Sequence, residues 1–217
     1  TAGRRLFVMQ QFRDFLGREA DAAGLDYWAA EIAAGRQTRA SMAESFLNSA
    51  EYQNQVAPIV RLFFATYLRI PDYSGLIFWT GQFRSGMSLN AVAEAFANAP
   101  EFVARYGTLS NRDYIDRLYQ NILGRPADQG GIDYWTGQLN GGVTRGAMLA
   151  NFSESAEYKV RINNSVYVTM IYVGMLRRAP EQGGFDFWKG AMDGGRSGQD
   201  LIASFLPSME YRARFLP

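Results

Sequence analysis

One motif occurs four times along the chain, and this internal repeat constrains the fold more than any other feature of the sequence. It reads Arg-x-x-Asp-x-x-Gly-x-x-aromatic-Trp, followed by a glycine, a phenylalanine and a Glu-aromatic pair. The motif arginine, acid, glycine, tryptophan and late glutamate of the four copies are Arg18, Asp21, Gly24, Trp28 and Glu51; Arg69, Asp72, Gly75, Trp79 and Glu101; Arg125, Asp128, Gly131, Trp135 and Glu157; and Arg178, Glu181, Gly184, Trp188 and Glu210. Such self-similarity is typical of supersecondary units that bury their apolar faces against their neighbours.

Each copy contains three apolar stripes with helical spacing. Before the first motif lie Val8, Phe12 and Leu16, four residues apart, and the same spacing precedes the other three motifs. A second stripe at i, i+3 and i+7 contains the tryptophan, and a third, shorter one contains the phenylalanine. Four-residue spacing places side chains on one helix face, and no period-two pattern competes with it. The sequence therefore predicts an all-α fold of four tandem three-helix repeats packed as two pairs, as a helical array or bundle.

The boundaries of these helices also have sequence signals. The motif aspartates stand where a carboxylate can cap the second helix, and a glycine follows that helix in every copy. The residues expected to cap the third helix are Thr38, Ser88, Thr144 and Ser197.

The four copies are not equally alike. Copies one and three share Leu-Gly-Arg before the motif, whereas copies two and four replace that glycine with Leu68 and Arg177. Residues 107–111 include the turn-forming residues Gly107 and Ser110, and they predict a linker between copies two and three. A tandem duplication of a two-repeat unit explains this pattern. We therefore expect one repeat pair in 1-107, with repeats at about 4-54 and 55-107, and a second in 108-217, with repeats at about 111-162 and 163-217.

Composition excludes several classes of function. The 217 residues include no cysteine and no histidine, which removes thiolate and imidazole chemistry from catalysis and metal binding. A net charge of +1 gives no reason to expect nucleic-acid binding, and no segment has the roughly 20 apolar residues of a membrane span. We expect a non-enzymatic protein without cofactor or metal. Because the chain starts at Thr1 rather than Met, we also expect a fragment of a longer protein.

The segments Leu16–Trp28 and Leu123–Trp135, each followed later by Ser-Ala-Glu-Tyr, resemble the domain-of-unknown-function 4214 family. More distantly, they are similar to the linker domains of phycobilisomes. The family resemblance implies a small helical module of bacterial secreted, surface-layer-like or adhesin-like proteins, without known catalytic residues. It implies an extracellular or cell-surface location. The phycobilisome likeness implies scaffolding between larger proteins.

The repeated Arg-Asp-Glu set has two interpretations. It could form an anion or sugar subsite, made in the first copy by Arg18, Asp21 and Glu51. Alternatively, the arginine links a loop to helix ends within each repeat. All four copies keep the arginine and the late glutamate, and such ion-pair networks are commonly architectural, which favours the second interpretation. We expect each motif arginine to contact the late glutamate of its own repeat.

Aromatic side chains supply the other candidate surface. The four tryptophans are expected to be largely buried against Phe46, Phe96, Phe152 and Phe205, respectively. The residue before each tryptophan lies about 100° around the helix. It could stack on a sugar or dock a partner, but packing between repeats is the favoured interpretation. These four residues are Tyr27, Phe78, Tyr134 and Phe187.

Two functions from different classes remain. The first is assembly of a surface layer, filament or extracellular scaffold, and the second is glycan binding by a secreted or surface adhesin-like protein. Assembly could use the chain ends, where Phe7 and Phe215 are candidate contact residues and Leu216 and Pro217 finish the sequence. A head-to-tail contact would form a ring if it closes and a filament if it does not. The expected partner is a second copy or another surface protein, with a glycan as the alternative.

Overall fold

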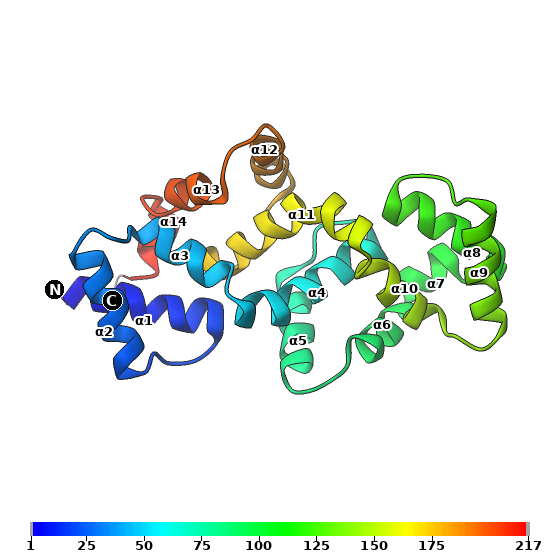
Figure 1. The fold of residues 1–217 in the computed structure, drawn as a ribbon, viewed down its shortest axis with the longest axis horizontal. Coiled ribbons are helices and arrows are strands. Elements are labelled where there is room, and N and C mark those ends of the chain that lie inside the picture. Colours follow the sequence, from blue (N-terminus) through cyan, green and yellow to red (C-terminus); the bar gives the residue numbers. More distant parts are fainter. Residues whose placement is uncertain (1, 216–217) are drawn as a thin grey trace. The chain divides into compact units, whose positions relative to one another are not determined.

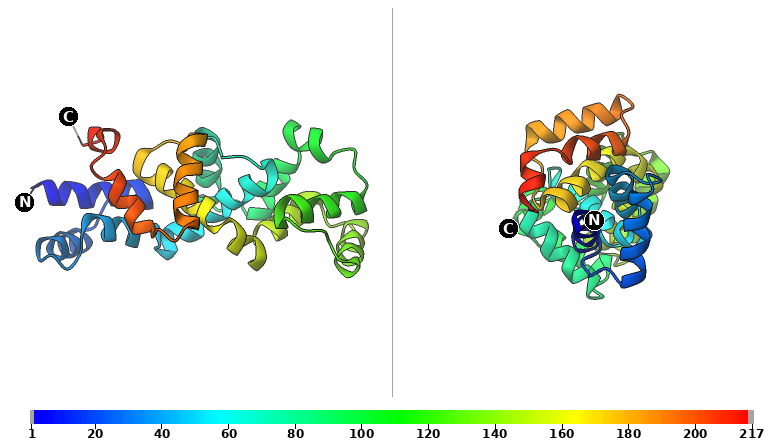
Figure 2. Two further views of the ribbon diagram at one scale, coloured as in Figure 1. Left: turned by 90° about the horizontal axis from the view of Figure 1, so that it is seen from above. Right: turned by 90° about the vertical axis from the view of Figure 1, so that its left-hand side faces the viewer.

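The computed structural model describes residues 2–215, and within them the only regular structure is helical (Figures 1 and 2). This confirms the all-α fold class. The helices of repeat 1 are α1 (Ala2–Gln11), η1 (Phe12–Leu16), α2 (Ala22–Ala33) and α3 (Arg39–Leu47). Those that follow are α4 (Ala50–Tyr67), α5 (Tyr73–Arg84), α6 (Leu89–Ala97) and α7 (Pro100–Tyr106). Repeat 3 has α8 (Asn111–Leu118), η2 (Tyr119–Leu123), α9 (Gln129–Asn140) and α10 (Arg145–Ser153). The chain continues with α11 (Ala156–Ile171), η3 (Tyr172–Leu176), α12 (Gln182–Asp193), α13 (Gly198–Phe205) and α14 (Met209–Ala213).

The caps that the sequence predicts are present. The carboxylates of Asp21, Asp72 and Asp128 accept hydrogen bonds from the backbone N–H of the motif glycine, at 2.6–2.7 Å. The hydroxyl groups of Thr38, Ser88, Thr144 and Ser197 each accept a bond from the backbone N–H three residues later. These bonds satisfy backbone donors that a helix start leaves free. Local sequence therefore sets where each second and third helix begins.

The first helix of each repeat ends in a left-handed residue. In repeats 1, 3 and 4 its last turn is the π-helical segment η1, η2 or η3. The residue that follows the helix has a positive φ in every copy: 66° at Gly17, 55° at Leu68, 69° at Gly124 and 56° at Arg177. Copies two and four thus place a side chain in a conformation that favours glycine.

Contacts divide the chain into two compact units. Unit 1 combines the segment that ends at Asn54 with the segment that starts at Tyr167, and unit 2 is Gln55–Val166. Unit 1 therefore contains repeats 1 and 4, and unit 2 contains repeats 2 and 3. This grouping differs from the sequential pairs 1-107 and 108-217 expected above. The reason lies in the third helices, because α3 packs on α13 and α6 packs on α10.

Each unit has its own apolar core. In unit 1 it includes Phe15, Met42 and Leu47, and in unit 2 it includes Leu62 and Ile122, all fully buried. Among residues 2–215, no helix combines the length and the hydrophobicity that crossing a bilayer would need.

Candidate functional site

The motif arginine of every repeat is held by the late glutamate of the same repeat. Its Nε and Nη2 atoms donate to the two carboxylate oxygens at 2.5–3.2 Å. The four pairs are Arg18–Glu51, Arg69–Glu101, Arg125–Glu157 and Arg178–Glu210. This confirms the contact that the sequence predicts. We call each pair the arginine clamp.

The guanidinium group of each clamp packs over an aromatic ring. The guanidinium carbon lies 5.1–5.5 Å from the centroid of Phe12, Tyr67, Tyr119 or Tyr172, a cation–π distance. Hydrogen bonding to Arg125 holds the pKa of Glu157 below its ordinary value, and the bond to Glu210 raises the pKa of Arg178. Since the fork of each guanidinium is occupied by a carboxylate, an anion could bind there only by displacing the glutamate. The clamp is therefore suited to joining the end of the first helix to the helix that carries the glutamate.

The fourth copy differs in its acid. Glu181 makes no side-chain cap to α12, whereas its carboxylate pairs with Arg178 at 2.5 Å. The longer side chain thus adds a second carboxylate to the clamp instead of capping the helix.

The four tryptophans are only partly buried. The expected contacts are present, since the indole ring centroids lie 5.3–5.7 Å from those of Phe46, Phe96, Phe152 and Phe205. Trp28, Trp79, Trp135 and Trp188 each keep an intermediate exposure, so the expectation that they are largely buried holds only in part. The second helices lie at the surface of their repeats: α2 buries no residue and α12 buries only Phe185.

The residue before each tryptophan is exposed in all four copies. The exposed fractions are 58% for Tyr27, 56% for Phe78, 58% for Tyr134 and 62% for Phe187. The favoured interpretation, packing between repeats, is therefore wrong for the described chain. Each of these rings stands edge-to-face against its tryptophan, with centroids 4.8–5.3 Å apart and planes at 73–83°. Contact with the partly buried indole holds the exposed ring in place.

Small residues flank each exposed ring on the same helix face, four positions before it and three after it. The pairs are Ala23 and Ala30, Ser74 and Gly81, Gly130 and Gly137, and Gly183 and Gly190. A Cβ atom added to Gly81, Gly137 or Gly190 would have no neighbour within 4 Å, so the space beside the backbone is open. We call the exposed ring with its small flanking residues the aromatic face.

The chain ends do not present the surface that the sequence suggests. Phe7 is only 3% exposed and stacks on Phe215, with ring centroids 6.5 Å apart, so the segment after α14 folds back onto α1. Phe215 keeps 37% of its surface exposed. Phe7 is therefore not available to a partner in this conformation. The candidate residues Leu216 and Pro217 lie outside the described residues.

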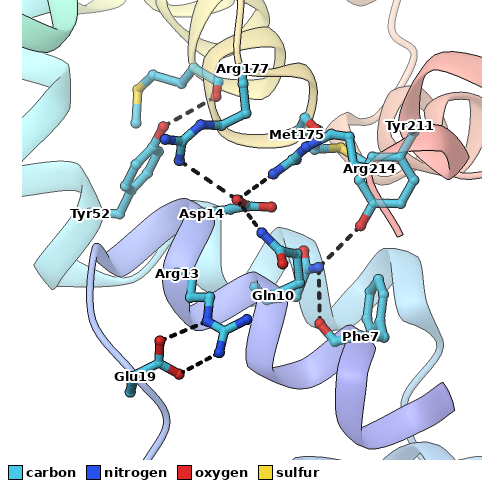
Figure 3. Close-up of polar contacts among 12 residues, drawn as sticks. Phe7, Gln10, Arg13, Asp14, Glu19, Tyr52, Met175, Arg177, Tyr211 and Arg214 are labelled. Atoms are coloured by element: carbon cyan, nitrogen blue, oxygen red, sulfur yellow. Dashed lines mark hydrogen bonds and ion pairs between the residues drawn. The ribbon is translucent and has the colours of Figure 1, made fainter. Parts of the chain in front are cut away.

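Sequence reasoning missed a buried polar network in unit 1 (Figure 3). The side chain of Asp14 is 1% exposed, and its Oδ1 atom accepts from Arg214 at 2.5 Å and from Gln10 at 2.8 Å. Arg177 lies 3.7 Å from the same atom. The available signal was an acidic residue among the apolar positions of the first helix.

These features define an all-helical repeat protein whose copies each carry a clamp and an exposed aromatic face. The family model described as Domain of unknown function (DUF4214) matches residues 3–56, 93–162 and 158–215. The chain belongs to this family. Comparisons with curated proteins and with solved structures found no match.

Proposed function

We propose that this is a non-enzymatic interaction protein that mediates protein assembly through its aromatic faces. The observation that carries the proposal is the same exposed ring in the same surroundings in all four repeats. The clamp also recurs four times, but its polar groups are already paired. The aromatic face is the repeated feature that has apolar surface left to bury.

Energetics support this use of the aromatic face. Burying a large apolar side chain completely is worth about 1.5–3 kcal/mol, so a ring that is more than half exposed could contribute roughly 1–2 kcal/mol on association. Small flanking residues let a partner approach closely, and contact with the tryptophan lowers the entropy lost on binding. Several faces on one chain also allow multivalent binding.

Glycan binding is the second candidate, since an aspartate precedes the exposed ring in three copies. An aromatic ring beside a carboxylate could stack on a sugar and accept its hydroxyl groups. In this structure those carboxylates are occupied: Asp26 pairs with Arg5, Asp133 accepts from Gln129 at 2.7 Å, and Asp186 accepts from Gln182 at 2.9 Å. Their engagement favours a protein partner over a sugar.

The proposed location is the bacterial cell surface or the extracellular space, and it rests on the family resemblance of the motif strings. Antibody labelling of intact and permeabilised cells would test it. Labelling that required permeabilisation would contradict this part of the proposal.

Sedimentation velocity over a wide concentration range tests the proposed function. The full chain should associate through its aromatic faces, and a variant with serine at Tyr27, Phe78, Tyr134 and Phe187 should lose that association. Val103→Ser and Val160→Ser, at positions 50% and 81% exposed outside the aromatic faces, serve as controls and should associate normally. If the full chain stays monomeric but binds a glycan array in a way that the serine variant does not, the glycan alternative replaces assembly.

A further inference from the structure

In unit 2 a short chain segment connects the two repeats, whereas no such segment connects the corresponding helices of unit 1. In unit 2, residues 107–110 connect α7 of repeat 2 to α8 of repeat 3. The corresponding helices of unit 1 are α14 and α1, at opposite ends of the described chain. A hydrogen bond that occurs in both units shows this correspondence. Arg105 donates to the carbonyl of Thr66 in unit 2, and Arg214 donates to the carbonyl of Met175 in unit 1. Each residue of the second bond lies 109 positions after its counterpart in the first.

The two junctions use different chemistry at equivalent positions. Repeat 1 places Gln11 and Asp14 where repeat 3 has Leu118 and Asn121. In unit 1, Gln11 donates to the hydroxyl of Tyr211 at 3.1 Å and Asp14 pairs with Arg214. These residues come from opposite ends of the chain.

In unit 2 the residues that correspond to Gln11 and Asp14 are neutral. Leu118 and Phe102 stand at the places of Gln11 and Tyr211, and both are apolar and buried. Asn121 donates to the hydroxyl of Tyr106 at 2.9 Å. A buried ion pair and a directional hydrogen bond thus occur at the junction that lacks a connecting segment. Buried polar groups of this kind can specify which elements pair.

A groove lies at the junction of unit 1, where no chain segment connects the two repeats. In unit 2, Arg145 stacks on Tyr114 and donates to the carbonyls of Tyr106 and Leu109, which flank the connection. The equivalent Arg39 stacks on Phe7 and makes no hydrogen bond or ion pair among the described residues. It lines a groove of about 970 Å³ together with Leu6, Met209 and Phe215. The groove therefore lies beside the arginine whose counterpart binds the connection in unit 2.

We propose that two copies of this chain exchange repeats, so that repeat 1 of each copy packs on repeat 4 of the other. Every contact that closes unit 1 joins residues from the two ends of the sequence. A second copy offers the same residues in the same geometry, including Asp14 for Arg214 and Gln11 for Tyr211. Exchange of an identical element preserves the native contacts and is a low-cost route to dimers. In unit 2 the short connection at residues 107–110 keeps repeats 2 and 3 of one chain close together, which favours their pairing within that chain.

Covalent closure of the chain tests the exchange. Refolding from urea at high protein concentration should yield a species of twice the 24.3 kDa chain mass, and refolding at low concentration should yield monomer. In this test both the open and the cyclised chain carry serine at Tyr27, Phe78, Tyr134 and Phe187, which removes association through the aromatic faces. Cyclisation joins the last residue to the first and keeps repeats 1 and 4 of one copy close together, so the cyclised chain should refold to monomer at both concentrations. Equal dimer formation by the cyclised chain, or no dimer from the open chain, would overturn the proposal.

Charge reversal gives a second test with its own control. Asp14→Arg and Arg214→Asp each place like charges together in a closed monomer, but a mixture of the two chains can satisfy both junctions by exchange. Refolded together, they should give a heterodimer that neither gives alone. A single chain that carries both substitutions shows whether the protein folds with the reversed ion pair. If it does not, Gln11→Leu with Tyr211→Phe, which copies unit 2, replaces the reversed pair. Because the same contacts close the monomer and the exchanged dimer, the dimer fraction after concentrated refolding should match that of the wild type, and a dimer lost with this pair would count against exchange.

This inference does not depend on the proposed function. Serine substitution of the aromatic faces should leave exchange intact, whereas cyclisation should leave association through the aromatic faces intact. The experiments therefore distinguish a failure of the exchange proposal from a failure of the proposed function.

Discussion

Removing one arginine clamp should lower stability without changing association. Arg178 offers the strongest case, because it pairs with Glu210 and Glu181 and stacks on Tyr172 at 5.1 Å. Arg178→Ala removes all three contacts together. The Arg178 side chain is 38% exposed, so solvent screens its ion pairs.

The magnitude follows from the separate contacts. A well-oriented ion pair at the surface contributes about 0.2–1 kcal/mol, and a cation–π contact at an exposed site about 0.5–1 kcal/mol. With the additional carboxylate of Glu181, the loss in the free energy of unfolding should be about 1–2 kcal/mol. Arg178→Lys should fall between the wild type and the alanine variant, because lysine keeps the charge but lacks the planar fork.

Urea denaturation followed by circular dichroism measures this loss. Arg196→Ala is a matched control, because Arg196 is exposed in the same unit and forms no ion pair among residues 2–215. Sedimentation of both variants should match the wild type. If Arg178→Ala were as stable as Arg196→Ala but failed to associate, the clamp would be a binding subsite and the reasoning would be refuted.

Three further outcomes are expected. Leu68→Gly should raise the thermal midpoint, with a gain of about 0.5–1 kcal/mol, because φ at Leu68 is 55°; a lower midpoint would show that its side chain matters more than the backbone strain. In denaturant titrations Phe96→Ala should cost about 3–5 kcal/mol and Trp79→Ala less, because Phe96 is 1% exposed and the indole is only partly buried; the reverse order would contradict the burial described here. Burial raises the pKa of Tyr67 and of Tyr211 to about 12, so the contribution of these two phenols to stability should be constant below about pH 10, where the unfolded phenols are neutral, and fall between pH 10 and 12; a stability curve that stays flat from pH 10 to 12 would show that these hydroxyls are not buried.

Local features of the fold could be predicted from the sequence. Capping residues such as Asp72 and Thr144 act within one turn of a helix, so their spacing alone determines what they do. The clamp could also be predicted, because the arginine and the late glutamate recur together in every copy. Two residue types that recur together in all four copies are expected to lie close together in each repeat.

Features that depend on distant contacts could not be predicted. The pairing of repeat 1 with repeat 4 depends on residues such as Asp14 and Arg214, which are 200 positions apart and occur only once. The period also places Phe187 about 100° from Trp188, but it does not show whether a neighbouring repeat covers the ring. Likewise, the apolar end of the chain suggested a free Phe7, whereas Phe215 folds back onto it.

Acrylamide quenching of tryptophan fluorescence, measured as the chain associates, is the most direct test of the aromatic faces. Every tryptophan lies edge-to-face with an exposed ring, so association through these faces must shield the indoles. The cyclised chain should be used, since cyclisation keeps its repeats 1 and 4 close together and so disfavours exchange. The quenching constant should fall as sedimentation detects larger species. Association with an unchanged quenching constant would contradict the role assigned to the aromatic faces.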